Sequence, residues 1–198
     1  MHRFLGRLVI GASALLMAAT AQAQGTSNTS GRPWKVGGAL GGTIPIGDFS
    51  DAADLGWHLG GLFEYTRPSI PVTWRGEITY HRHGLKEDFF DEIPGVGNLD
   101  GTFSMVTFIA NALYPFGDAA STARPFVIGG LGLYRVKASA DFNGIDISSS
   151  ETKFGLNLGG GFNFTLSGFE TFVELRYHTV FTEDSNTNFI PISFGFKF

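Results

Sequence analysis

Polar and apolar residues alternate along most of the chain with a period of two. Between Lys153 and Leu166, apolar residues occupy nearly every even position and glycine, asparagine, lysine or threonine the odd ones. This period places the apolar side chains on one face of a β-strand, whereas a helix would spread them around its circumference. From Ile190 to Phe198 the same rule holds. Both segments are therefore predicted to be strands.

The same pattern predicts eight strands, at 34–45, 56–66, 71–83, 102–115, 124–137, 152–166, 169–181 and 188–198. They are 11 to 15 residues long, which is enough for a tilted strand to cross a bilayer, since about 9–11 residues suffice. Short connections at 67–70 and 167–168 alternate with the long polar stretches 84–101 and 138–151. Transmembrane barrels distribute their inner turns and outer loops in this way. The predicted fold is all-β, an eight-stranded antiparallel transmembrane β-barrel.

Composition agrees with a sheet that faces lipid and excludes several function classes. Glycine accounts for 28 of the 198 residues and phenylalanine for 20, while 16% are charged, against about 25% in an average soluble domain. The absence of cysteine excludes a disulfide framework, a thiolate zinc site and a cysteine nucleophile. The formal net charge of −4 argues against a nucleic-acid partner.

The polar faces of the strands predict what fills the barrel. Eight strands enclose a space just wide enough for side chains. Five charged residues are predicted to form an interior polar network: Glu64, Arg75, Glu77, Glu174 and Arg176. A soluble ligand-binding barrel, the alternative with the same strand number, has an apolar interior and does not accommodate these charges. A narrow permeation path through the network remains the alternative to a closed plug.

Aromatic residues near the predicted strand ends are expected to form two girdles at the membrane interfaces. The inner girdle comprises Trp34, Tyr65, Trp74, Tyr114, Phe164, Phe169 and Phe198. The outer girdle comprises Trp57, Tyr80, Phe103, Phe154, Tyr177 and Phe189.

The N-terminus has the features of a secretory signal. Arg3 and Arg7 precede an apolar run from Leu8 to Thr20, and an Ala-Gln-Ala sequence ends at Ala23. A run of about 13 apolar residues is too short for a spanning helix, which needs about 20. We therefore expect a cleaved signal peptide at 1–23, a short polar leader at 24–33 and a barrel domain at 34–198.

The chain resembles the OmpA/OmpX-like family of small outer-membrane β-barrels of Gram-negative bacteria. The resemblance is carried by the signal sequence, the alternating strands, the stretches Arg124–Gly132 and Phe172–Tyr177, and the closing Phe189–Phe198. It implies location in the bacterial outer membrane. It also implies that Phe194, Phe196 and Phe198 are an assembly signal for the barrel-assembly machinery.

Four histidines fall on the predicted inward face near the outer ends of their strands: His58, His81, His83 and His178. Two imidazoles on one strand face, at His81 and His83, present their nitrogens in one direction, as a transition-metal site requires. The sequence thus offers a metal site or a mouth that gains charge near the reference histidine pKa of about 6.5. The alternative is a structural role, in which the histidines share hydrogen bonds above the polar network.

One stretch of the chain is similar to a catalytic motif. Residues Arg176 to Thr179 resemble the His-x-Ser pair of outer-membrane lipid A deacylases, but Thr179 stands in place of serine, and His178 points inward by parity. We therefore expect no enzymatic activity and no cofactor. Most acidic residues lie in the predicted outer loops, as solvated charge or as groups that divalent cations bridge to lipopolysaccharide phosphates.

The predicted function is that of a structural or surface-interaction (adhesin-like) barrel acting through these acidic loops, with 84–101 and 138–151 as the contact surface. A small passive diffusion pore is the alternative, followed by a lipid A-modifying enzyme. Expected partners are outer-membrane lipid and lipopolysaccharide, the barrel-assembly machinery and an unidentified surface ligand. We expect no nucleic-acid partner, and we expect a monomer.

Overall fold

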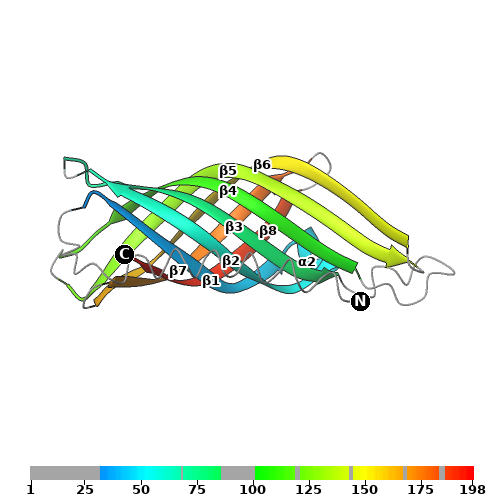
Figure 1. Cartoon of the computed structure of the whole chain (residues 1–198), viewed down its shortest axis with the longest axis horizontal. Coiled ribbons are helices and arrows are strands. Elements are labelled where there is room, and N and C mark those ends of the chain that lie inside the picture. The colour runs from blue at the N-terminus through cyan, green and yellow to red at the C-terminus, as the bar shows by residue number, and fades with distance from the viewer. Residues whose placement is uncertain are drawn as a thin grey trace, which may run out of the picture. The chain divides into compact units, whose positions relative to one another are not determined.

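The computed structural model describes residues 32–67, 69–85, 101–118, 121–142, 145–166, 169–182 and 186–198. It contains β1 (Trp34–Ile46), α2 (Asp48–Ala52), β2 (Ala53–Thr66), β3 (Thr73–Leu85), β4 (Gly101–Pro115), β5 (Ala123–Phe142), β6 (Ile145–Leu166), β7 (Phe169–Phe181) and β8 (Asn186–Lys197) (Figure 1). The predicted signal peptide and most of the leader lie outside the described residues. Within those residues, no helix is long and apolar enough to cross a membrane.

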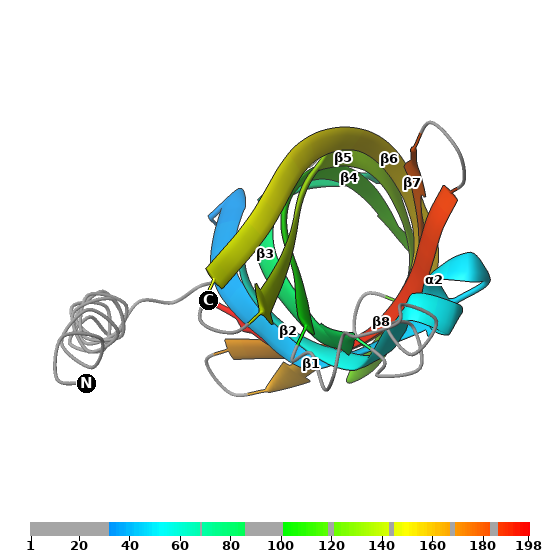
Figure 2. The same ribbon diagram turned by 90° about the vertical axis from the view of Figure 1, so that its right-hand side faces the viewer.

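The eight strands close into one antiparallel barrel in sequence order (Figure 2). The seam is formed by β1, which pairs with β2 on one side and β8 on the other. Leu40, for example, lies between Leu59 and Phe194. Closure gives every strand two neighbours, so the backbone needs no hydrogen-bonding partner from lipid. The predicted fold class is thereby confirmed.

The most apolar side chains lie on the outside. Leu158 is 68% exposed, and Phe162 and Phe194 are each 52% exposed. Phe154, Leu156 and Phe196 also face outward. Soluble proteins bury most of their large apolar side chains. The exposure of these side chains on a closed barrel therefore indicates that the outer surface faces lipid.

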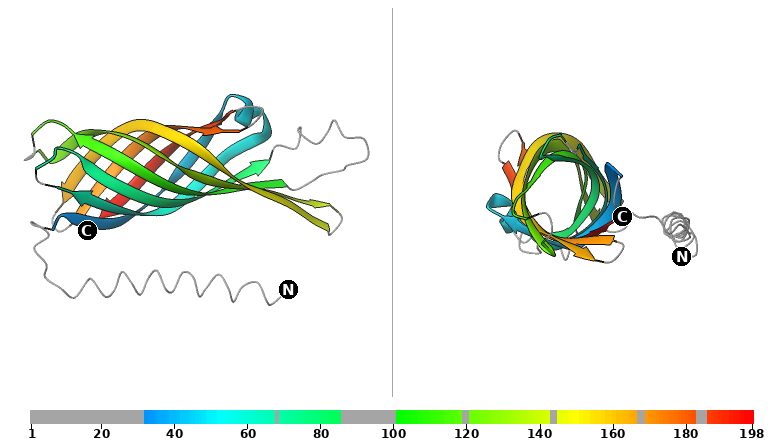
Figure 3. Two further views of the ribbon diagram at one scale, coloured as in Figure 1. Left: turned by 90° about the horizontal axis from the view of Figure 1, so that it is seen from above. Right: turned by 90° about the vertical axis from the view of Figure 1, so that its left-hand side faces the viewer.

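One predicted loop is a strand extension. The stretch 138–151, expected to be a loop, forms the end of a long hairpin in which Ala138 pairs with Ser149 and Phe142 pairs with Ile145. The hairpin of β5 and β6 projects beyond the other strands (Figure 3, left). Its residues lack the alternating pattern because both faces lie beyond the lipid-facing wall, where nothing selects for one apolar side. The other predicted loop, 84–101, lies mainly outside the described residues.

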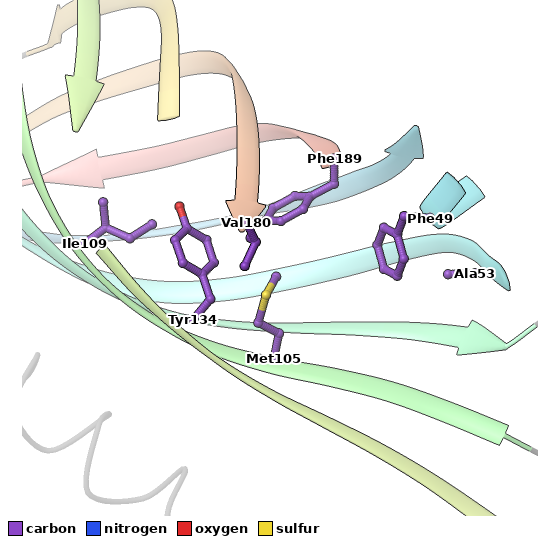
Figure 4. Close-up of a cluster of buried hydrophobic side chains, with 7 residues drawn as sticks. All are labelled: Phe49, Ala53, Met105, Ile109, Tyr134, Val180 and Phe189. Carbon is purple, nitrogen blue, oxygen red and sulfur yellow. The ribbon is translucent and has the colours of Figure 1, made fainter. Parts of the chain in front are cut away.

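Two apolar clusters lie inside the barrel in addition to the expected polar groups. The outer cluster contains Phe49, Ala53, Met105, Ile109, Tyr134, Val180 and Phe189 (Figure 4). The inner cluster contains Leu62, Leu113, Phe126, Ile128 and Phe172. Phe49 is carried by α2 and reaches the mouth of the barrel, where its ring centroid lies 4.9 Å from that of Phe103.

Two residues expected in the outer girdle therefore lie elsewhere. Phe189 is fully buried inside the barrel, and Phe103 packs against the outer cluster. The reason is parity, because Phe189 shares the face of Ser193 and Lys197, which point inward. The lumen near the outer mouth is filled by aromatic rings instead of charges.

Inward-facing glycines make room for these rings. A Cβ atom at Gly195 would lie 2.2 Å from Cζ of Phe172, and one at Gly155 would lie 2.7 Å from Cε2 of Tyr134. Both distances are shorter than contacts that real Cβ atoms make. The glycine content of the chain thus has a packing cause, since a narrow lumen holds a large side chain only where the wall opposite it is bare.

Candidate functional site

A buried ion network crosses the middle of the barrel. Arg75 is at its centre: its Nη2 lies 2.7 Å from Oε1 of Glu64, and its Nη1 lies 2.7 Å from Oε2 of Glu174 and 3.2 Å from Oε1 of Glu77. Nη1 of Arg176 lies 2.7 Å from Oε2 of Glu77, and its Nε lies 2.8 Å from Oε1 of Glu174. The structure therefore brings together the five residues expected to form the interior network.

The strand geometry explains this arrangement. Arg75 and Glu77 are two residues apart on β3, and Glu174 and Arg176 are two residues apart on β7, so each pair faces the lumen. Because β3 and β7 are four strands apart in a barrel of eight, they lie on opposite walls. Glu64 joins them from β2, where it pairs directly with Arg75.

The last strand completes the network with a residue that sequence reasoning left out. Nζ of Lys197 lies 3.1 Å from Oε2 of Glu64 and donates to Oδ1 of Asn163 at 2.9 Å. At the inner rim, Lys35 forms an ion pair with Glu170. Lys197 alternates with outward phenylalanines, so its parity was a usable signal for an inward position.

The network contains equal numbers of positive and negative charges, and an aromatic ring packs against its central guanidinium. Three carboxylates, on Glu64, Glu77 and Glu174, meet three cations, on Arg75, Arg176 and Lys197. The guanidinium carbon of Arg75 also lies 4.8 Å from the ring centroid of Phe172. Buried charges require this pairing because each ion loses its hydration on leaving water.

The lumen between the network and the histidines is nearly filled. A cavity of about 20 Å³ lies there, lined on one side by Glu77 and Arg176 and on the other by His58, His81 and His178. Such a volume holds about one water molecule. It does not accommodate a hydrated ion.

Hydroxyl groups of the lumen wall lie within hydrogen-bond distance of three of the four histidines, and His58 and His81 share Thr43. The His58 ring lies within hydrogen-bond distance of Thr43 Oγ1 (3.0 Å) and Ser193 Oγ (2.9 Å). Nδ1 of His178 lies 2.9 Å from the Tyr134 hydroxyl oxygen. His81 lies 3.3 Å from Thr43 Oγ1 through its own Nδ1.

Phe189 packs against two of the predicted metal ligands, whereas the rings of His58 and His81 lie side by side with centroids 5.3 Å apart. The Phe189 centroid lies 5.4 Å from that of His81 and 4.8 Å from that of His178. His83 is further out, with Nδ1 3.0 Å from the carbonyl oxygen of Asp54. Among the described residues, no three histidine, aspartate or glutamate side chains come together as metal ligands. The described geometry thus gives no support to the metal site predicted at His58, His81, His83 and His178, and metal binding there stays a prediction.

His178 is also enclosed with respect to lipid. It is 1% exposed, and its ring stacks on Phe189 inside the barrel. Its neighbour Tyr177, on the opposite face of β7, is the residue that faces outward. The stretch from Arg176 to Thr179 thus presents no imidazole to the lipid-facing surface.

The terminal phenylalanines expected to act as an assembly signal lie on the outer surface. Phe194, Phe196 and Phe198 are 52%, 42% and 51% exposed. They form a continuous apolar stripe along β8, next to the β1 seam.

Residues 11–198 match the family described as outer membrane protein beta-barrel domain. The chain belongs to this family. Membership places the protein in the bacterial outer membrane. No curated protein matches the chain significantly.

Solved barrels of the outer membrane are similar to this chain in fold. Neisserial surface protein A (NspA) is 19% identical, with a TM-score of 0.60 over 84% of this chain and 96% of that one. Ail, the attachment invasion locus protein of Yersinia pestis, is 16% identical, with a TM-score of 0.56 over 83% and 97%. A major outer membrane protein from Thermus thermophilus is 13% identical, with a TM-score of 0.60 over 84% and 99%.

Proposed function

We propose that this protein is a closed, non-catalytic outer-membrane barrel that binds a partner at the cell surface through its β5–β6 hairpin. The observation that carries the proposal is an open strand edge. The β6–β7 ladder begins at Gly155, which pairs with Val180. Among the described residues, 145–154 pair with β5 alone.

An open edge of this kind is a template for strand addition. The ten-residue segment 145–154 extends over about 34 Å, at about 3.4 Å per residue, and every second residue directs its backbone N–H and C=O groups to the open edge. Extended peptides bind such edges through main-chain hydrogen bonds, and proteins usually cover or shorten edges that have no use. The acidic outer loops then add electrostatic selection of the partner.

The filled lumen favours this proposal over a pore. Arg75, Arg176 and Lys197 cross the lumen in ion pairs, and the cavity beside them holds about one water molecule. The comparison with Ail, whose name describes attachment and invasion, agrees with a surface role. We further propose assembly of a monomer by the barrel-assembly machinery through Phe194, Phe196 and Phe198.

A hairpin-shortened variant tests the proposal. Residues 139–148 are replaced by Asn-Gly, which joins the paired residues Ala138 and Ser149 by a two-residue turn. Bacteria displaying either form are tested for adherence to immobilised fibronectin, laminin and collagen. We expect bacteria with the shortened form to lose adherence. Equal amounts of protein at the cell surface and the heat-modifiable gel mobility of a folded barrel are the controls.

A second variant separates the hairpin from the acidic loop. It carries Asn or Gln in place of the acids of 84–101, and we expect weaker but measurable adherence. Full adherence of the shortened hairpin would contradict the proposal. Steady single-channel conductance of the wild-type protein in planar bilayers would favour the pore alternative instead.

A further inference from the structure

A cluster of cations lies on the outward wall at the outer end of the barrel. Arg82 on β3 pairs with Ser104 on β4, which pairs with Lys137 on β5. Arg135 lies two residues from Lys137 on the same face, and all three cations are exposed. Since adjacent strands are about 4.8 Å apart, the backbones of Arg82 and Lys137 are about 10 Å apart, and their long side chains can reach one anion.

These cations have no anionic partner in the described part of the protein. None of Arg82, Arg135 and Lys137 lies within 4.0 Å of a described carboxylate. Asp54 lies beside Gly84, two residues beyond Arg82, without forming an ion pair with it. In a chain with a formal net charge of −4, three exposed cations grouped on one wall form a local positive patch that is suited to bind an external anion.

The cluster is at the height of the lipid headgroups. Trp57 pairs with Arg82 across β2 and β3, and its ring centroid lies 5.7 Å from that of Tyr80. Both rings face outward. Tryptophan and tyrosine on a lipid-facing wall mark the membrane–water interface, so the cations begin where the acyl chains end.

A groove in the same wall lies below the cations. It has a volume of about 620 Å³, with Phe63, Ile78 and Phe108 as walls and the small residues Gly76 and Ala110 in its floor. A Cβ atom at Gly76 would have no neighbour within 4 Å, so the space above this glycine is open. The groove is therefore an open depression in the apolar outer surface between β2, β3 and β4.

The separation between cations and groove matches one lipid leaflet. Six residues separate Arg82 from Gly76, which is about 20 Å along the strand. With a strand tilt of about 40°, the depth is about 15 Å, or half of the hydrocarbon core of about 30 Å. A lipid with its phosphate on the cations would place the end of an acyl chain in the groove.

We propose that this wall binds lipid A, the phosphorylated anchor of lipopolysaccharide. One phosphate contacts Arg82, Arg135 and Lys137, and one acyl chain fills the groove over Gly76. Ser104 and Thr152, the strand partners of Lys137 and Arg135, place hydroxyl groups beside the proposed phosphate position. Cations and groove share one lipid-facing wall, which favours a lipid over a soluble polyanion. The inference does not depend on the surface partner proposed above.

Native mass spectrometry of the detergent-solubilised barrel tests the proposal with lipid A as the probe. A lysine or arginine near anionic lipid headgroups contributes about 1 kcal/mol to binding, so its removal should weaken lipid A binding about fivefold. We therefore expect about 100-fold weaker binding for Arg82→Gln/Arg135→Gln/Lys137→Gln. Gly76→Ile fills the groove and should weaken binding about tenfold, as expected for about two methylene groups displaced from apolar contact.

Matched controls use the same changes elsewhere. Arg67→Gln removes an exposed cation at the opposite end, beyond β2. Gly42→Ile enlarges an exposed glycine of β1. A Cβ atom added at Gly42 would lie 3.9 Å from its nearest neighbour, the carbonyl oxygen of Gly56. Both should bind lipid A like the wild type. Heat-modifiable gel mobility verifies folding, and the three single cation variants replace the triple variant if it does not fold.

Two results would overturn the proposal. The first is unchanged lipid A affinity in the triple variant or, where that does not fold, in all three single variants. The second is that deacylated lipid A headgroup or sucrose octasulfate binds as tightly as lipid A while Gly76→Ile has no effect. The second result would assign the cations to a soluble polyanion.

Discussion

Replacement of Arg75 by glutamine tests the energetics of the ion network most directly. Arg75 is fully buried and contacts three carboxylates. Without it, Arg176 and Lys197 face three carboxylates, and one negative charge is left uncompensated inside the barrel. Removing one partner of a buried pair destabilises a protein by about 3–5 kcal/mol. We expect a loss of this size in the free energy of unfolding.

The measurement is urea unfolding of the barrel in phospholipid vesicles, followed by tryptophan fluorescence. Trp34, Trp57 and Trp74 all face outward and are 37%, 49% and 55% exposed, so their emission reports the transfer of the wall from lipid to water. Linear extrapolation gives the free energy of unfolding for each variant.

Two further variants separate charge balance from simple loss of a side chain. Arg75→Gln/Glu174→Gln removes one charge of each sign and should be less destabilised than the sum of the single variants by about 1–3 kcal/mol. Lys35→Gln breaks a partly exposed rim pair and should change stability by at most about 1 kcal/mol. An Arg75→Gln variant within about 1 kcal/mol of wild type, or strictly additive effects, would refute the reasoning.

Three other outcomes follow from the packing of the lumen. Gly195→Ala places a Cβ atom 2.2 Å from the ring of Phe172 and should destabilise the barrel by about 1–3 kcal/mol in the same unfolding assay; wild-type stability would contradict the packing argument. Tyr134→Phe removes the hydroxyl beside His178 and should reduce stability by about 1–3 kcal/mol, since it leaves a buried ring nitrogen unpaired. Added zinc should leave the melting temperature unchanged, whereas a rise with zinc concentration would support the predicted metal site.

The alternating pattern predicts the barrel, its strand number and the facing of most side chains. This is possible because successive strand residues face lipid and lumen in turn. The lipid-facing positions require apolar side chains, and the lumen-facing positions accept polar ones. The inward positions of Arg75, Glu77, Glu174 and Arg176 follow from the same local rule. The rule fails where the two faces of a strand have the same surroundings. At 138–151 the chain does not alternate, so the pattern predicts a loop, whereas the structure has the end of a hairpin there.

Contacts across the lumen were decided by the tertiary structure. Lys197 meets Glu64 because β8 closes on β1, which brings together residues 133 positions apart. The four histidines share one predicted end of the barrel, but Phe189 lies between His81 and His178. The row from Arg82 to Lys137 depends on the register of three strands. Period two specifies the face of each residue, whereas the stagger between strands, set by barrel closure, determines which residues share a height.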